Sequence, residues 1–249
     1  MPDRTLEELW ETAPRATERF DPVRVAALPE GARRYLSYAI APGSLLPSAA
    51  RLTMHGTIRL KDSWDAFEAE QVIRWDRGFV WRARVKMHGL VVSGFDRLVD
   101  GEGMMRWKLF GLIPFVTAEG AEISRSAAGR LHAEACWLPS VLLSDEISWT
   151  DLGQRHAGPV VRAHGEETQL DFELDQRGAL IACRFPRWGD QGTGKFHYED
   201  FGGWIDERRS FAGLTIPTRM RLGWFFGSER FEEPGGEFFR VGVDGVEYR

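Results

Sequence analysis

Hydrophobic and polar residues alternate along most of the chain after Ala50, as they do in β-strands with one buried face. In the segment 51–60, one face collects apolar side chains, namely Leu52, Met54, Ile58 and Leu60. The same alternation recurs in the segments 65–75, 79–87 and 167–174. Short turns such as Asp76-Arg77-Gly78 join successive segments, and the glycine-rich stretch 187–194 reads as a loop. The pattern predicts an antiparallel meander of about ten or eleven strands with one polar face.

Two regions depart from this alternation and have helical spacing. In residues 1–45, Pro22 and Pro29 occupy positions typical of a first helical turn. The second region is an inserted helix of about residues 122–143, which we expect Ser124 to cap. Pro139 either stops the helical run or starts a new turn. Its apolar residues form one stripe at helical spacing: Ile123, Ala127, Ala128, Leu131, Ala135 and Leu138.

These patterns define an α+β fold class. We expect one domain over residues 1–249, in which an N-terminal helical segment (residues 1–45) packs on a sheet formed by residues 50–249. A large antiparallel sheet of so many strands has to curl. The expected architecture is therefore a half-open β-barrel with the central helix over its concave face.

Composition narrows the choice of partners and compartment. The net charge of −5 disfavours nucleic acid and anionic membranes as partners. No apolar run is long enough to span a bilayer, and the N-terminus lacks the apolar stretch of a signal peptide. Cys136 and Cys183 form no metal or redox motif. We expect a cytoplasmic protein with reduced thiols, whose oligomeric state the sequence leaves open.

The candidate site is centred on a carboxylate in the apolar stripe of the central helix. Glu134 falls between Ile123 and Ala127 on a helical wheel, with Arg130 one turn earlier on the same side. A carboxylate on a buried face has to be paired, protonated or solvated by a cavity. One interpretation is a structural ion pair that ties the helix to the sheet. The other is an acid or base that lies in a cavity and takes part in catalysis together with Arg130.

A polar amide and many aromatic residues extend this candidate site. Gln71 lies on an otherwise apolar strand face, where it either satisfies a backbone group or orients a ligand. The chain has ten tryptophans and sixteen phenylalanines, which are large enough to fill a thick core or to line a pocket. The residues that we expect to contact a ligand are Gln71, Trp75, Trp81, Trp107, Trp137 and Tyr198.

Patterns for metal or nucleophilic chemistry are weak. His55 and His88 each lie in a Met-His-Gly triplet among basic neighbours, a poor setting for a cation, and the sequence shows no zinc-ligand spacing. His132 and Cys136 are four residues apart, which is a weak signal for a nucleophilic dyad. We therefore expect neither a metal nor a cofactor.

Several motifs together resemble an uncharacterised bacterial family. They are Phe67-Glu-Ala-Glu-Gln71, Phe79-Val-Trp-Arg-Ala83, Arg130-Leu-His-Ala-Glu134, Trp137-Leu-Pro and Ile216-Pro217. The resemblance runs from about Leu28 to the end, and the chain departs from the pattern between Arg187 and Trp204. It implies no assigned activity. The architecture is similar to the lipoprotein-carrier (LolA-like) half-barrel, which carries lipids in some proteins and performs cofactor-free chemistry in others.

Two functions of different classes fit these observations. The first is cytoplasmic binding of a hydrophobic or aromatic small molecule in the concave face of the sheet. The second is a cofactor-independent enzyme of lyase, isomerase or cyclase type, with Glu134 as general acid or base and Arg130, Gln71 and Tyr198 positioning the substrate. Polar groups gathered on one side of an apolar pocket would favour the enzyme, and a uniformly apolar tunnel would favour the binding protein.

Overall fold

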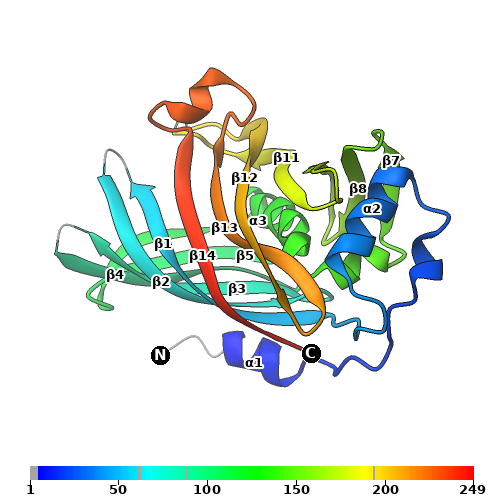
Figure 1. The fold of residues 1–249 in the computed structure, drawn as a ribbon. Helices are drawn as coiled ribbons and strands as arrows, with labels where there is room; N and C mark the ends of the chain where they lie inside the picture. The colour runs from blue at the N-terminus through cyan, green and yellow to red at the C-terminus, as the bar shows by residue number, and fades with distance from the viewer. Residues whose placement is uncertain (1–4, 61–62, 88, 193) are drawn as a thin grey trace.

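The computed structural model describes residues 5–60, 63–87, 89–192 and 194–249. Within these residues the strands form one antiparallel sheet of 14 strands, which curls round a central helix (Figure 1). We call β1–β6 the first arm: β1 (Ala49–Leu60), β2 (Ser63–Arg74), β3 (Gly78–Met87), β4 (Leu90–Val99), β5 (Glu102–Leu109) and β6 (Ile113–Glu119). We call β7–β14 the second arm: β7 (Ile147–Asp151), β8 (His156–Ala163), β9 (Glu166–Gln169), β10 (Asp171–Leu174), β11 (Leu180–Gly189), β12 (His197–Phe211), β13 (Leu214–Trp224) and β14 (Glu237–Tyr248). The arms join in the middle of the sheet, where β1 pairs with β14.

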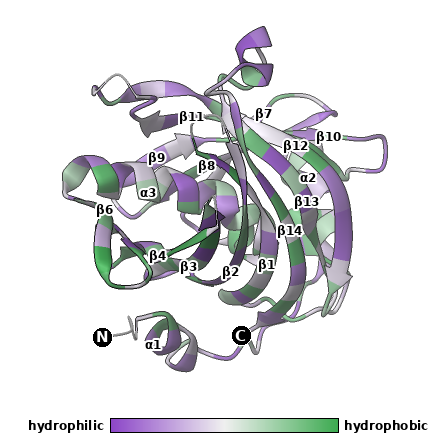
Figure 2. Ribbon diagram, turned by 90° about the vertical axis from the view of Figure 1, so that its left-hand side faces the viewer, coloured by the Kyte–Doolittle hydropathy of each residue, from purple (hydrophilic) through white to green (hydrophobic). Residues whose placement is uncertain are grey.

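The central helix is the connection between the two ends of this sheet. Strands β6 and β7 are the terminal strands of the sheet path, and the chain runs between them through α3 (Ala121–Glu134). Two 3-10 turns follow the helix, η2 (Ala135–Trp137) and η3 (Pro139–Leu143). The helix crosses the concave face and contacts β5 in the first arm and β11 in the second (Figures 1 and 2). The expected helix over the concave face is therefore present, and the sheet is curled as expected. The helix is shorter than expected, because it ends at Glu134 and the 3-10 turns take up most of the remaining residues to 143.

The N-terminus of α3 differs from the expectation. Gly120, which has a φ of 105°, precedes the helix, and Ser124 lies within it. The Ser124 hydroxyl accepts a hydrogen bond from the Gly103 N–H at 2.8 Å and donates one to the Gly120 carbonyl at 3.1 Å. Ser124 therefore ties the first turn of α3 to β5 instead of capping the helix. On the other side, Arg125 forms an ion pair with Glu166 of β9 at 2.9 Å.

The expected count of ten or eleven strands is too low. Strand β4 was missed because Ser93, Gly94 and Asp96 weaken its apolar pattern. Gly94 is required there, since a Cβ at this position would clash with the Arg106 carbonyl and with Trp107 on β5. Strand β8 was missed because it contains the glycine–proline pair 158–159.

The glycine-rich stretch 187–194 is strand for some of its length and not loop throughout. β11 continues to Gly189, and β12 runs unbroken through Gly202 and Gly203. A Cβ at Gly202 or Gly203 would clash with carbonyl oxygens of the neighbouring strands, so these glycines permit close strand packing and do not mark turns. Residue 193 of the expected loop lies outside the described residues.

The N-terminal helices pack on the sheet. Helix α1 (Thr5–Glu11) lies on the opposite face of the first arm from α3 (Figure 1). Its buried side chains Leu6, Leu9 and Trp10 pack against Ala49, Val72 and Val80. Strand alternation thus buries both faces of β2 and β3, one under α1 and the other under α3. Helix α2 (Glu30–Ala39) contacts β8 and β13, and two further 3-10 turns are η1 (Pro22–Val25) and η4 (Glu229–Glu232).

Two helical glycines lead to opposite stability predictions. A Cβ at Gly129 of α3 would meet Phe185 Cε2 at 3.8 Å, an ordinary contact, whereas a Cβ at Gly31 of α2 would clash with the His156 carbonyl oxygen. Gly129→Ala is expected to raise the free energy of unfolding by about 0.5–1 kcal/mol, because alanine loses less backbone entropy in a helix. Gly31→Ala is expected to lower it by about 2 kcal/mol. Urea denaturation of both variants measures the two changes, and a stabilised Gly31→Ala protein would contradict the packing described here.

Candidate functional site

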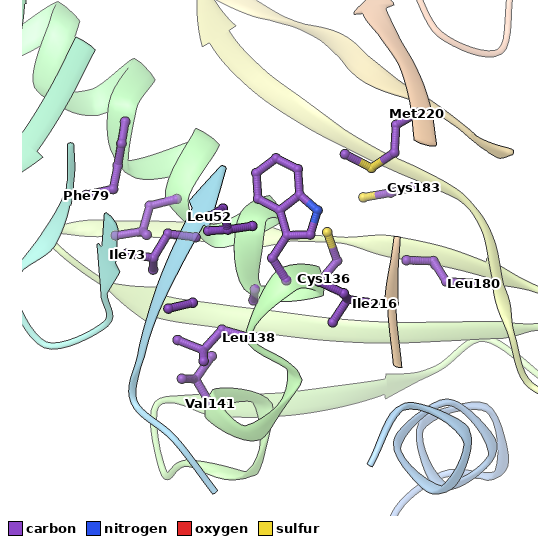
Figure 3. Packing of buried hydrophobic residues seen from close by; sticks show 14 of the residues in the cluster. Leu52, Ile73, Phe79, Cys136, Leu138, Val141, Leu180, Cys183, Ile216 and Met220 are labelled. Atoms are coloured by element: carbon purple, nitrogen blue, oxygen red, sulfur yellow. The ribbon is translucent and has the colours of Figure 1, made fainter. Parts of the chain in front are cut away.

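A cavity of about 370 Å³ lies between α3 and the concave face of the sheet. Its apolar wall comes mainly from β1 and the second arm: Met54, Ile58, Leu180, Phe185, Phe201, Ile205, Met220, Leu222, Trp224, Phe238 and Phe239. Cys136 of η2 and Cys183 of β11 add two sulfur atoms to this wall (Figure 3). Ligand pockets commonly have volumes of roughly 300–1,000 Å³ and mostly apolar linings, so this cavity is large enough for a small molecule.

Glu134 is held at the side of the cavity that faces the first arm. The Arg130 Nε donates a hydrogen bond to Glu134 Oε1 at 2.7 Å, and the Gln71 Nε2 donates one to Oε2 at 2.5 Å. The residue is 8% exposed, and both of its carboxylate oxygens have partners. Gln71 of β2 is fully buried and its oxygen accepts from Arg130 Nη2 at 3.3 Å. The three side chains singled out on polar grounds therefore meet at one place.

A second carboxylate, Asp96 of β4, completes this group. Its Oδ1 accepts a hydrogen bond from Trp107 Nε1 at 2.8 Å, and its Oδ2 lies 3.4 Å from Arg130 Nη1. Burial raises the pKa of Asp96, while the Arg130 charge and the Trp107 hydrogen bond oppose that rise. We call Gln71, Asp96, Arg130 and Glu134 the polar cluster. Sequence reasoning missed Asp96 with its strand, although Val92, Asp96 and Leu98 share the inward face of β4.

Arg130 is fixed by stacking as well as by its ion pairs. The centre of its guanidinium lies 4.5 Å from the centroid of the Phe79 ring and 5.4 Å from the Trp81 ring. Such contacts of a cation with aromatic faces are attractive and hold the planar group in one orientation. Arg130 therefore joins two acids, one amide and two aromatic rings.

Arg187 of β11 brings a second cation to the cavity wall from the opposite arm. Its guanidinium stacks 4.6 Å from the Phe201 centroid and 5.4 Å from the Trp224 centroid. Burial and the Arg130 charge lower the pKa of Arg187 to about 10, although Glu134 and Asp96 oppose the change. A pKa of about 10 leaves the side chain protonated at pH 7. The alternation of β11 could have identified this residue, because Cys183, Phe185 and Arg187 share one face of the strand.

The aromatic residues expected to contact a ligand divide into two sets. Trp81 and Trp137 line the cavity, and Trp137 Nε1 donates a hydrogen bond to the Pro217 carbonyl at 3.1 Å. Trp107 is not among the lining residues and instead holds Asp96.

Trp75 and Tyr198 are not among the residues that line the cavity either. Trp75 Nε1 donates a hydrogen bond to Glu146 at 2.8 Å. Tyr198 is 46% exposed, and its hydroxyl accepts a hydrogen bond from Arg125 at 2.8 Å. The structure therefore places Tyr198 with the side chains that join α3 to the second arm, apart from the polar cluster.

The histidine and cysteine near the end of α3 do not form a nucleophilic dyad. His132 Nε2 donates to the Ala163 carbonyl at 3.1 Å, so Nδ1 accepts from the Thr168 hydroxyl at 2.8 Å. Burial lowers the pKa of His132 to about 4 and raises the pKa of both Cys136 and Cys183. At neutral pH these groups are an uncharged imidazole and two protonated thiols.

Two further findings concern metals and membranes. Within the described residues, no group of three or more His, Cys, Asp or Glu side chains is placed to hold a metal ion. Nor does the described chain contain a helix that is long and apolar enough to cross a membrane. His55 pairs with Asp244 at 2.9 Å, and His88 lies outside the described residues.

These observations define a class of protein, an open antiparallel half-barrel with a helix-covered, largely apolar cavity. The chain belongs to the family of unknown function DUF6544, which matches residues 18–233. The expected membership in an uncharacterised family is therefore confirmed. No curated protein matches the chain.

Three solved structures are similar to this chain in shape. A LolA superfamily protein from Nitrosomonas europaea is 7% identical with a TM-score of 0.48, over 88% of this chain and 92% of that one. A putative outer membrane lipoprotein-sorting protein domain from Vibrio parahaemolyticus is 7% identical with a TM-score of 0.42, over 81% and 86%. A DUF1329 family protein from Desulfovibrio piger is 9% identical with a TM-score of 0.43, over 92% and 94%. Because all three TM-scores are below 0.5, we draw no conclusion about a ligand from these similarities.

Proposed function

We propose that the protein binds a hydrophobic or aromatic small molecule in the cavity between α3 and the concave face. The observation that carries this proposal is the cavity of about 370 Å³, whose wall is built mainly of Met, Leu, Ile, Phe and Trp side chains. Burying apolar surface of a ligand against such a wall is favourable by about 25 cal/mol per Å². We also propose that the protein is cytoplasmic.

A change of cavity volume tests this proposal. Ala133 of α3 lines the cavity, whereas Ala127 of the same helix is half-buried outside the lining. Ala133→Met is expected to weaken binding of the neutral fluorescent probe N-phenyl-1-naphthylamine about tenfold, because the longer side chain occupies ligand space. Ala127→Met, the matched control, should bind the probe as the wild type does. The probe's fluorescence increase on titration measures both, and equal loss in the two variants would place the binding elsewhere.

A second candidate is a cofactor-independent enzyme of lyase, isomerase or cyclase type that uses the same cavity. It is favoured by the one-sided arrangement of polar groups, because the polar cluster lies toward the first arm and the wall of the second arm is mostly apolar. Glu134 or Asp96 would then exchange a proton with a bound substrate.

Comparison of the compounds that co-purify with wild-type and variant protein distinguishes the two candidates. Glu134→Gln and Asp96→Asn remove the acids but keep the side-chain shape. A binding protein should carry the same compound in all three forms, as judged by mass and chromatographic retention. An enzyme should carry a different compound in the variants, because the substrate would accumulate there. If the wild type and both variants carry the same compound, the proposal of an enzyme is wrong.

A further inference from the structure

Two buried nitrogen atoms in the cavity wall have no hydrogen-bond partner. They are Nε of Arg187 on β11 and Nε1 of Trp81 on β3. Both atoms are donors, and among the described lining residues no buried side-chain oxygen lacks a partner. A buried donor without an acceptor costs about 1–3 kcal/mol, so native proteins rarely leave one unmatched. The wall therefore has spare donors and no spare buried acceptor.

Two arginines and two acids line the cavity in equal number, but their ion pairing is uneven. Glu134 and Asp96 are already bound by Arg130, Gln71 and Trp107. No ion pair joins Arg187 to an acid of the described chain, and its stacking on Phe201 and Trp224 leaves its Nε donor unused. A cationic ligand would have to displace Arg130 from its two acids, whereas an anionic ligand meets Arg187, a cation without an ion-pair partner among the described residues.

We infer that the ligand is an amphiphile with one negatively charged, oxygen-bearing head group that binds Arg187, a fatty carboxylate being the simplest case. This inference rests on the proposed function and specifies its ligand class. A planar guanidinium matches the two oxygens of a carboxylate, and a charge-assisted bond of this kind is stronger than a neutral one. The hydrocarbon chain lies along the apolar wall of β1 and β12–β14. A single unpaired cation favours a monoanion over a dianion such as a phosphate monoester.

Three probes with one chain length test the inference on the wild-type protein: decanoate, decanol and decyltrimethylammonium. Titration followed by tryptophan fluorescence is expected to show that decanoate binds at least about tenfold more tightly than the other two. If none of the three binds, the proposed function fails and the inference with it. If decanol binds as tightly as decanoate, the proposed function stands and the inference is wrong. If decyltrimethylammonium binds most tightly, the inference is wrong, and Glu134 or Asp96 receives the head group instead of Arg187.

Variants of Arg187 add a residue-level test. Arg187→Met should weaken decanoate binding by about tenfold to a hundredfold and leave decanol binding within about twofold. Arg187→Lys, which keeps the charge, should restore some of the decanoate affinity. Arg184→Met removes an exposed arginine from the same strand and should change neither affinity. If the Arg187→Met variant binds decanoate as tightly as the wild type does, Arg187 does not bind the carboxylate head group. The probe comparison on the wild type decides the inference even where a variant fails to fold.

Discussion

Replacing Glu134 by glutamine is expected to lower the free energy of unfolding by about 3 kcal/mol. The substitution keeps the shape of the side chain but removes the charge that lies 2.7 Å from Arg130 Nε. Arg130 then keeps one ion pair, the longer contact of 3.4 Å with Asp96. Because the Arg130 and Glu134 side chains are only 20% and 10% exposed, water replaces the lost partner poorly, and a poorly compensated cation remains inside the protein. Urea denaturation of the two proteins measures the difference.

A surface ion pair of similar geometry provides the control for this prediction. Arg162 and Glu167 are 2.6 Å apart, but their side chains are 54% and 61% exposed. Glu167→Gln is therefore expected to cost less than about 1 kcal/mol, because solvent and salt screen exposed charges. Equal effects of Glu134→Gln and Glu167→Gln would mean that Glu134 is as well solvated as a surface residue.

The free energy of unfolding is expected to fall by up to about 3 kcal/mol as the pH is lowered from 6.5 to 4, through His132 alone. Burial lowers the pKa of this imidazole from 6.5 to about 4. In that window the unfolded chain binds a proton at His132 and the folded chain does not, so acid favours unfolding. The stabilisation is complete above pH 6.5 and is lost by about pH 4.

The contribution of His132 is isolated by subtracting the pH profile of a variant from that of the wild type. His132→Gln should lack this component of the pH dependence, because an amide does not titrate. His197→Gln removes a half-exposed histidine and should keep it. NMR titration of the wild-type imidazole gives a second measurement, and a His132 pKa near 6.5 would rule out the proposed dependence.

Sequence alternation predicted the strands in which the pattern was unbroken, and it also pointed to some of the site. Gln71 and Glu134 were recognised because each is a polar residue on an otherwise apolar face. The structure brings these two side chains together at 2.5 Å. Their contact depends on the curl of the sheet, which no local pattern describes.

Asp96 and Arg187 were missed although each obeys the same rule. Their strands contain Gly94, or Pro186 and Gly189, and these residues conceal the alternation that would have placed the charges on an inward face. Gly94 and Gly189 are needed because the Trp107 ring of the neighbouring β5 and the Trp224 ring of β13, two strands away, occupy the space of a Cβ. The glycines that close packing requires near the cavity thus interrupt the hydrophobic alternation from which Asp96 and Arg187 could have been predicted.

The route of α3 has a mechanical consequence for the cavity. Its first turns are fastened to β5 through Ser124 and Gly103, and to β9 through Arg125 and Glu166. The helix thus links the first arm of the curled sheet to the second, and these links oppose separation of the two arms. We therefore expect these contacts to limit changes in the distance between the two arms, and with it changes in the width of the cavity beneath the helix.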